Sequence, residues 1–338
     1  MDTIIITGSG GLVGSEAVKR FTSPKGLVIG FDTNARKSWF GQHASVEAVI
    51  DNNSKINNYK HFFVDIRDKF AVEKFIDGFK PKAVIHCAAQ PSHEKSAEIP
   101  YDDFQVNTVG TVNLLEAIRM YSPKTSFVFT STNKVYGNRP NLLPMKLGET
   151  RYELLCDGVD ETMSLDESLH SPFGASKAAA DLIVQEYGRY YNLNTACFRC
   201  GCITGPLHQG VEQHGFLNYL CKVAKRNQTY TIYGHEGKQV RDNIHASDLV
   251  DAFAAYLDDP TPGAVYNIGG GLENSCSIIE AIQKIKDLTG IEIQTKHGEA
   301  RKGDHLCYLT NAKRFRNRYP TWQIKYSLDK IFSELLDV

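Results

Sequence analysis

Three glycines near the N-terminus, Gly8, Gly11 and Gly14, have the spacing of a loop that wraps a phosphate group. Glycine permits a tight turn and a close approach of the main chain to a pyrophosphate, and a helix that starts there adds oriented N–H groups. An apolar run precedes the triplet, and a helical pattern starting at Leu12 and Val13 follows it. A strand before and a helix after favour a dinucleotide site over an ordinary structural turn.

A carboxylate at the end of the second apolar run is suited to binding the ribose of such a dinucleotide. Asp32 lies about 20 residues beyond the glycines, where it can accept hydrogen bonds from both ribose hydroxyls and would repel a 2′-phosphate. Arg36 is the counter-argument, because its guanidinium could pair with that phosphate. Asp32 favours NAD over NADP as the cofactor. Leu12, Val13 and Asn107 are also expected cofactor contacts. The others lie at or just beyond the ends of apolar runs: Asn34, Asp65, Ile66, Ala88, Ala89 and Gln90.

The elements that must position these residues alternate along the first 200 residues. Apolar runs indicate strands at residues 3–7, 27–32, 61–66, 83–89, 126–132 and 195–199. Helical patterns separate them at residues 12–21, 69–79, 104–120 and 174–191. Near-continuous apolar strands alternating with helices are typical of a parallel sheet covered on both faces, so the sequence predicts an α/β fold with a doubly wound parallel sheet. The carboxyl ends of its strands form the edge where ligands bind.

Beyond about residue 200 the pattern changes to a smaller, mixed α/β lobe. Short strands are expected at residues 229–233 and 264–268, and helices at residues 215–226, 246–256, 277–288 and 328–336. We expect residues 1–200 to form the cofactor-binding domain and residues 201–338 to form mainly the substrate-binding lobe. Because no Pro/Ser-rich linker separates them, the chain is expected to return to the first domain around residues 240–265.

Composition excludes several classes of partner. The 338 residues carry a formal net charge of -1, with 42% hydrophobic and 23% charged residues, which is ordinary for a globular protein. A near-neutral chain lacks the concentrated positive charge that nucleic-acid binding requires. No apolar run approaches the ~20 residues that span a bilayer, and the N-terminus lacks the features of a signal peptide. We therefore expect a cytoplasmic protein with neither a nucleic-acid nor a membrane partner.

Eight cysteines raise the question of a metal site or of disulfides. Without an export signal, reduced thiols are the expected state. The run Cys197-Phe198-Arg199-Cys200-Gly201-Cys202 is too tightly spaced for a zinc site and has no second Cys/His pair at the usual distance. We expect no metal, and small buried hydrophobic side chains instead.

Further motifs follow the glycine loop in a fixed order, and together they carry a resemblance. They are Asp65-Ile66-Arg67-Asp68, the stretch His86–Ala89, Asn107-x-x-Gly110-Thr111, Ser131-Thr132-Asn133-Lys134-Val135-Tyr136-Gly137, and a helix with Lys177. The chain resembles the extended short-chain dehydrogenase/reductase family over nearly its whole length. The resemblance implies a Rossmann-type sheet, NAD that stays bound, and a nucleotide-sugar whose carbinol is oxidised and then reduced from its other face.

Within that family, residues 131–137, 149–153 and 237–242 are most similar to the branch that epimerises a CDP-3,6-dideoxyhexose at C2. A CDP-sugar is therefore the expected substrate. A C4-epimerase, or another nucleotide-sugar oxidoreductase of the same family, is the alternative.

The resemblance also implies a catalytic set, and this sequence departs from it at the central position. Thr132 is expected to align the sugar hydroxyl, and Lys177 to bind the nicotinamide ribose and lower the pKa of a tyrosine four residues earlier. That position is Phe173, which has no ionisable group. The chain is a Tyr-to-Phe variant made to trap a substrate, or it carries Phe naturally and uses another base, or it binds a nucleotide-sugar without turning it over. His93, His170 and Tyr152 are the candidate substitute bases, although an ordinary loop histidine is the alternative for the first two.

Asn133 and Lys134 bear on the type of reaction. Dehydratases of the family carry an Asp-Glu pair at these positions to eliminate water. Asn cannot protonate a leaving hydroxide, and Lys inverts the charge, so a 4,6-dehydratase is disfavoured.

Two arginines are expected to bind the diphosphate of the substrate. Arg241 and Arg301 match family positions, and guanidinium pairs bidentately with phosphate oxygens. Arg199 is expected to be structural, and Asn107 to anchor the main chain beside the cofactor. The other expected substrate contacts are Gln90, Thr132, Asn133 and His214, with Asn218 a weaker candidate.

The resemblance further implies a homodimer that pairs helices 104–120 and 174–191 across a two-fold axis. The apolar residues considered for that interface are Val109, Val112, Leu115, Ile118, Leu182 and Val184. Burial within one chain would explain many of them equally well.

Overall fold

The computed structural model describes residues 2–24, 26–212 and 214–338. Within them, seven parallel strands form one sheet with the order β12-β8-β5-β4-β1-β2-β3. The central strand shows why: Ile5 and Ile6, neighbours that point to opposite faces, are both fully buried, so each face of the sheet is covered. The strands are β1 (Asp2–Thr7), β2 (Gly26–Phe31), β3 (Tyr59–Phe62), β4 (Ala83–His86), β5 (Ser126–Thr132), β8 (Thr195–Cys200) and β12 (Ala264–Ile268).

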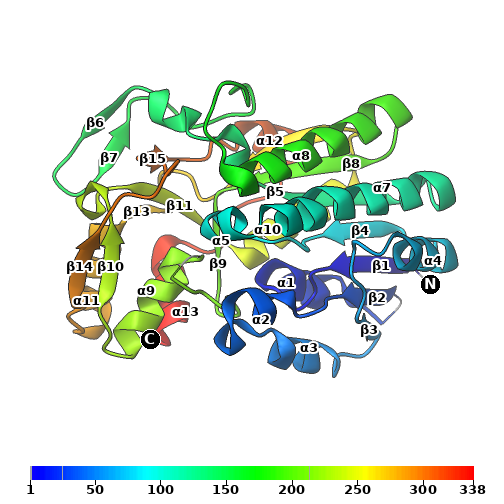
Figure 1. Ribbon diagram of the computed structural model, residues 1–338, viewed down its shortest axis with the longest axis horizontal. Coiled ribbons are helices and arrows are strands. Elements are labelled where there is room, and N and C mark those ends of the chain that lie inside the picture. Colours follow the sequence, from blue (N-terminus) through cyan, green and yellow to red (C-terminus); the bar gives the residue numbers. More distant parts are fainter. Residues whose placement is uncertain (1, 25, 213) are drawn as a thin grey trace.

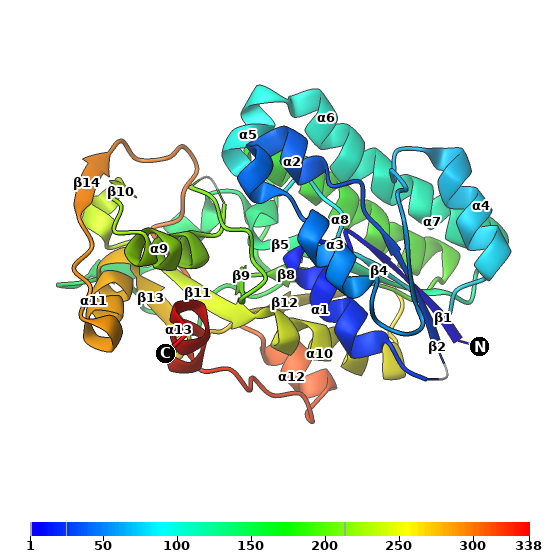
Figure 2. The same ribbon diagram turned by 90° about the horizontal axis from the view of Figure 1, so that it is seen from below.

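Helices cover both faces of this sheet, and each layer closes its own apolar core (Figures 1 and 2). One layer consists of α1 (Leu12–Phe21), α10 (Ala246–Asp258) and α12 (Lys313–Arg318). The other consists of α4 (Lys69–Phe79), α7 (Gly110–Tyr121) and α8 (Ser171–Tyr191). The predicted Rossmann-type, doubly wound α/β fold is confirmed.

The strand order places a crevice above the middle of the sheet. From β1 the chain moves outward to β2 and β3, and then returns to place β4 on the other side of β1. Because the connections leave β1 and β4 in opposite directions, their carboxyl ends open a gap, which is the usual ligand position in such sheets. The shorter helices α2 (Ala35–Phe40), α3 (Glu47–Asn53), α5 (His93–Glu98) and α6 (Pro100–Phe104) belong to this part of the chain.

A smaller part built on mixed sheets lies beside the carboxyl edge of the large sheet (Figure 1). Strand β11 (Val240–His245) pairs with β9 (Cys202–Thr204), β13 (Ser275–Ser277) and β15 (Cys307–Tyr308). Two further pairs are β10 (Tyr230–Tyr233) with β14 (Thr295–Gly298), and β6 (Met145–Leu147) with β7 (Tyr152–Leu154). Its helices, α9 (Phe216–Lys225), α11 (Ile278–Thr289) and α13 (Leu328–Leu336), share one apolar core.

The strand expected in the smaller lobe at residues 264–268 instead extends the large sheet. Strand β12 pairs in parallel with β8 at the sheet edge. Tyr266 and Ile268 pack into the same core as Phe198 on β8, so burial against the large sheet determined where this strand lies.

Several boundaries differ from the sequence-based expectation, among them those of β3, of β4 and of the helix expected at residues 104–120. Strand β3 ends at Phe62 rather than residue 66, because Val64 N–H bonds back to Phe62 O and turns the chain outward. Strand β4 ends at His86, and residues 87–89 line the crevice instead. The helix expected at residues 104–120 starts at Pro100 and contains a π-turn, η2 (Gln105–Val109).

The remaining helical turns are short. They are the 3-10 segments η1 (Gln42–Ala44), η3 (Asn133–Tyr136), η4 (Arg139–Leu142) and η5 (His235–Gly237). Across the described residues, no helix combines the length and apolar character that a membrane crossing would need.

Candidate active site

The glycine loop between β1 and α1 leaves no room for side chains. Gly8 has a φ of +68°, and a Cβ there would stand 2.7 Å from the main-chain nitrogen of Ala88. A Cβ on Gly14 would stand 2.1 Å from Gly8 O. The loop therefore brings bare main chain to the crevice, with the N-terminus of α1 beside it, which suits the pyrophosphate of a dinucleotide.

Asp32 follows β2 and is held in place by main-chain donors. Its Oδ2 accepts a hydrogen bond from Gly10 N at 2.9 Å, and its Oδ1 accepts one from Asn34 N at 2.7 Å. Burial raises the pKa of this carboxyl, and the two N–H donors lower it. Asn34 itself bonds to Ser45 and Val46, and it is not among the residues that line the crevice.

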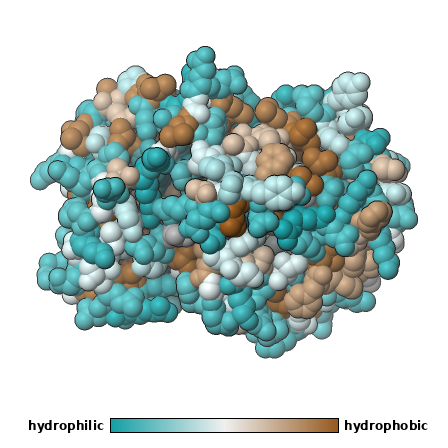
Figure 3. Space-filling model, viewed as in Figure 1, coloured by the Kyte–Doolittle hydropathy of each residue, from teal (hydrophilic) through white to brown (hydrophobic). Residues whose placement is uncertain are grey.

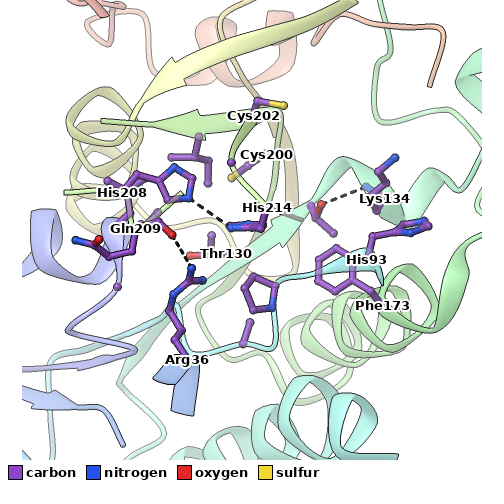
Figure 4. A pocket seen from close by; sticks show the side chains of 18 of the residues that line it. Arg36, His93, Thr130, Lys134, Phe173, Cys200, Cys202, His208, Gln209 and His214 are labelled. Atoms are coloured by element: carbon purple, nitrogen blue, oxygen red, sulfur yellow. Dashed lines mark hydrogen bonds between the residues drawn. The ribbon is translucent and has the colours of Figure 1, made fainter. Parts of the chain in front are cut away.

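A segment that we call the strap, residues 205–212, crosses the crevice from the glycine loop. It reaches the side where Asp32 is expected to bind the ribose, which we call the ribose end. At one end, Leu12 Cδ1 lies 3.3 Å from the Cβ position of Gly205. At the other end, Arg36 Nη2 donates to Gln209 O at 2.9 Å (Figure 4). His208 on the strap and His214 beyond it lie 3.4 Å apart, Nε2 to Nδ1, and burial lowers the pKa of both, that of His214 to about 3.

The reacting end lies where β5 and α8 meet. Lys177 Nζ donates to Thr130 O at 2.8 Å and lies 4.0 Å from the centroid of the Phe129 ring. Burial lowers the pKa of Lys177 to about 8. Thr132, the last residue of β5, accepts from Lys134 N through its Oγ1 at 3.2 Å. Phe173 lies one turn before Lys177 on α8 and lines the same cavity.

Helix α5 places His93 beside Phe173. Phe173 N donates to Ser96 Oγ at 3.1 Å, and Ser96 Oγ donates to His93 O at 2.7 Å. His93 lies close to Phe173 and Lys134, and all three side chains line the cavity (Figure 4).

The other two candidate bases lie elsewhere. Both ring nitrogens of His170 lie 2.9 Å from main-chain oxygens, those of Ser168 and Val135. Tyr152 packs edge-on against His235 at 6.3 Å between centroids. Neither His170 nor Tyr152 is among the residues that line the cavity.

Charged side chains surround the far end of the cavity. Arg241 Nη2 and Asp304 Oδ1 are 2.5 Å apart, and Lys134 Nζ lies 3.6 Å from the same oxygen. These cations hold the pKa of Asp304 well below its usual range in spite of its burial. Arg301 pairs with Glu94 at 2.7 Å and lies over the ring of Tyr233. Both arginines thus face the cavity while each is bound to a carboxylate.

Gln90 and Asn107 lie behind the cavity wall rather than in it. Asn107 Oδ1 accepts from Gln90 N at 2.9 Å, and Asn107 Nδ2 donates to Gln90 O at 3.2 Å. Both side chains also bond to the buried Asp103. Asn107, on the π-turn, therefore holds the main chain after β4 and does not line the cavity as the expected cofactor contact would, while the polar atoms of Gln90 are occupied within this network. Asn218 accepts from Gly210 N and is likewise outside the lining.

A cavity of about 460 Å³, in the size range of small-molecule sites, connects the two ends. Most residues expected in the site line it together: Gly8, Gly11, Leu12, Val13, Gly14, Asp32, Asp65, Ile66, Ala88, Ala89, Thr132, Asn133, Phe173, Lys177, His214, Arg241 and Arg301. Sequence reasoning missed Glu94, Asp304 and the strap residues Leu207 and Gln209, which also line it. The only sequence signal for Asp304 was its place next to Arg301 in Arg301-x-Gly303-Asp304.

The residues at the cofactor end fit a dinucleotide. The crowded glycine cradle, the helix terminus and the fixed carboxylate of Asp32 supply what its pyrophosphate and ribose need. Among the described residues, no group of three or more His, Cys, Asp or Glu side chains could hold a metal ion. All eight cysteines are free, and Cys197 and Cys200 are buried hydrophobic side chains on β8.

Comparison with known proteins agrees with a dinucleotide site. Residues 4–269 match the NAD dependent epimerase/dehydratase family. The CDP-paratose 2-epimerase of Salmonella typhi is 32% identical over 336 residues, which cover 96% of this chain and 95% of that protein.

Two solved structures extend the comparison. The Thermus thermophilus UDP-glucose 4-epimerase in complex with NAD has a TM-score of 0.80 at 26% identity, covering 99% of this chain and 98% of that one. The Bacillus anthracis dTDP-glucose 4,6-dehydratase in complex with NAD has a TM-score of 0.78 at 26% identity, covering 100% and 96%. The cofactor of the fold is NAD, and the chain belongs to the NAD dependent epimerase/dehydratase family.

Proposed function

We propose that the protein is a nucleotide-sugar epimerase that oxidises a sugar carbinol, turns the ketone over and reduces it from the other face. In this proposal, the large sheet binds NAD, and the smaller part built on mixed sheets covers the sugar nucleotide. The observation that carries the proposal is the pair Asn133–Lys134, which lines the cavity directly after Thr132.

This pair separates epimerisation from dehydration. Asn133 has no acidic proton to give to a leaving hydroxide. The Lys134 ammonium lies close to Asp304 and to Gly303 O, so a cation stands where dehydratases of the family carry a carboxylate. Thr132 and Lys177, which epimerisation requires, both face the cavity.

The strap favours a cofactor that is recycled in place. When bound, NAD⁺ supplies a hydride acceptor that returns the hydride within the same cycle. Arg36 and Gln209 join the strap to the cofactor end, so exchange of the cofactor would require this contact to open. An epimerase consumes no reductant and does not need that exchange.

For the substrate, we propose a CDP-3,6-dideoxyhexose that is epimerised at C2. The nucleotide and the carbon position rest on the similarity to the Salmonella typhi CDP-paratose 2-epimerase. Arg241 and Arg301 are placed to exchange their carboxylate partners for a diphosphate, because guanidinium binds both kinds of anion bidentately.

The test is to identify the cofactor that purifies with the protein by mass spectrometry and to follow CDP-paratose by NMR. We expect one NAD per chain and interconversion of the two C2 epimers. Lys177→Met should abolish it, whereas the exposed Lys124→Met serves as the matched control. UDP-glucose and dTDP-glucose are assayed in parallel. Epimerisation of UDP-glucose alone would move the reaction to C4, and loss of water from dTDP-glucose would overturn the proposal.

A further inference from the structure

The family reaction needs a group that removes the hydroxyl proton, and Phe173 cannot do so. We propose that His93 is the acid–base residue of this site, taking the hydroxyl proton of the carbinol and returning it. This inference rests on the proposed function. The proton is then transferred by a side chain on α5, whereas the tyrosine of the family is expected at position 173 on α8.

The placement of His93 follows from how α5 packs on α8. His93 is the first residue of α5, and Ser92 caps that helix by accepting from Lys95 N at 3.1 Å. The relay from Phe173 N through Ser96 Oγ to His93 O fixes this first turn against the start of α8. The His93 side chain consequently lines the cavity close to Phe173 and Lys134 (Figure 4), and Thr132 lines the same cavity.

Several other titratable side chains in or near the cavity are unsuitable. His170 and Tyr152 lie outside it. His208 and His214 contact each other near Arg36, at the ribose end. Burial raises the pKa of the Cys87 and Cys202 thiols to about 11, so neither is a thiolate at neutral pH.

Lys177 and Lys134 are engaged as cations. Lys177 donates to Thr130 O, and Lys134 lies close to Asp304 and Gly303 O. A protonated amine cannot accept the hydroxyl proton. Of the side chains compared, His93 is the one that lies close to Phe173 and whose ring nitrogens make no hydrogen bond to the described residues.

Burial and the cations around His93 keep its imidazole neutral. It faces Lys134 on η3, and Arg301 and Asp304 on the segment before β15, with Glu94 next to it on α5. Burial, Lys134 and Arg301 lower the pKa of His93 to about 4, while Asp304 opposes them. At neutral pH, the ring is therefore a proton acceptor, and Asp304 can stabilise the imidazolium that forms during the step.

The proton and hydride balance in each half of the cycle. In oxidation, the O–H and C–H bonds of the carbinol break and the C=O bond forms. The proton goes to His93 and the hydride to bound NAD⁺. In reduction, both return to the sugar, the hydride on the opposite face of the carbonyl. No co-reactant beyond NAD is consumed.

The experiment compares His93→Gln and His93→Ala with His43→Gln, a change at an exposed histidine outside the cavity. Three quantities are measured: turnover of CDP-paratose, bound NADH formed on addition of substrate, and NAD content together with the dissociation constant of CDP. We expect both His93 variants to lose about 10²- to 10⁴-fold in turnover and in the rate of NADH formation, with cofactor content and CDP affinity unchanged. Added imidazole should partly restore His93→Ala, but not Lys177→Met.

The pH profile gives an independent readout. On the acid side, kcat/KM of the unchanged protein should fall as the pH drops towards about 4, where His93 becomes protonated. A second substitution, Phe173→Tyr in the His93→Gln background, should restore activity and move the acid limb to higher pH, because a phenol then carries the proton.

The outcomes separate the two proposals. His93→Gln that is as active as the unchanged protein overturns the role of His93 and leaves the epimerase proposal standing. Loss of activity together with loss of CDP affinity, without rescue by imidazole, shows a structural role and also overturns it. If the unchanged protein forms no NADH and epimerises no CDP-, UDP- or GDP-sugar, the proposed function itself fails.

Discussion

Arg36 on α2 and Gln209 on the strap are joined by a 2.9 Å hydrogen bond from Nη2 to the main-chain oxygen, across 173 positions of sequence. The guanidinium also packs 5.2 Å from the centroid of the Phe40 ring. The cation that could have paired with a 2′-phosphate is thus committed to the strap. This leaves the Asp32 carboxylate, fixed by Gly10 N and Asn34 N, to face the ribose.

Substitution of Asp32 should weaken cofactor retention. We expect Asp32→Ala to lower NAD affinity by about 1.5–3 kcal/mol, because a hydrogen bond to a charged group is lost. Calorimetric titration of NAD and NADP into stripped protein measures it, with Asp51→Ala, an exposed carboxylate on α3, as the control. An unchanged protein that selects NADP over NAD would show that Arg36, not Asp32, determines the choice.

A tyrosine at position 173 should bring little gain while His93 is present. Because His93 already takes the hydroxyl proton, a phenol in place of the Phe173 ring adds a second acid–base group that the step does not need. We expect Phe173→Tyr alone to leave kcat for CDP-paratose similar or lower. A rise of about 10²- to 10⁴-fold would instead identify the chain as an inactivated Tyr-to-Phe form and exclude His93 as the base.

Acid should destabilise the fold through its buried histidines. Burial lowers the pKa of His86, His208 and His305 well below the ordinary value, so the folded chain leaves them neutral. The unfolded chain binds those protons below pH about 6.5. The contribution of these neutral histidines to the free energy of unfolding is therefore complete above that pH and is lost as the pH falls. Each such histidine contributes a slope of up to about 1.4 kcal/mol per pH unit.

Urea unfolding at pH 7, 6 and 5 measures that slope. His86→Gln should reduce it, because His86 lies between Thr7 Oγ1 and Thr111 Oγ1 and titrates only on unfolding. His43→Gln, at an exposed position, should leave the slope unchanged. Equal slopes in all three proteins would contradict the assignment.

We propose a homodimer whose interface includes fewer of the apolar residues than the sequence indicates. Leu115, Ile118 and Val184 are fully buried in the chain's own core and cannot contact a partner. Leu182 and Met120 are 50% and 54% exposed. Figure 3 shows hydrophobic residues among hydrophilic ones over the right-hand part of the view, where α7 and α8 lie in Figure 1.

Sedimentation at micromolar concentration tests this proposal. We expect a dimer, and Leu182→Glu should give a monomer because it places a charge in the interface. Leu272→Glu, at a 67% exposed leucine in a turn of the smaller part, is the control. A monomeric mass for the unchanged protein would refute the dimer.

The sequence by itself determined the features that depend on local patterns. The glycine loop, the helix after it and Asp32 at the end of β2 are fixed within about 25 residues of each other by turn geometry and by the periods of strand and helix. The family motifs also predicted that Thr132, Phe173 and Lys177 act together, and all three line one cavity.

Only the tertiary structure decided what surrounds Phe173 and which groups pair with the substrate arginines. His93 stands beside Phe173 because α5 packs on α8, and Asp304 meets Arg241 and Lys134 because the chain returns after β14. Gln90 faces away from the cavity because the π-turn at Asn107 binds its main chain. These contacts join residues 17 to 170 positions apart. They are selected by burial and by the need to satisfy hydrogen bonds across the whole fold, and neither requirement leaves a local period in the sequence.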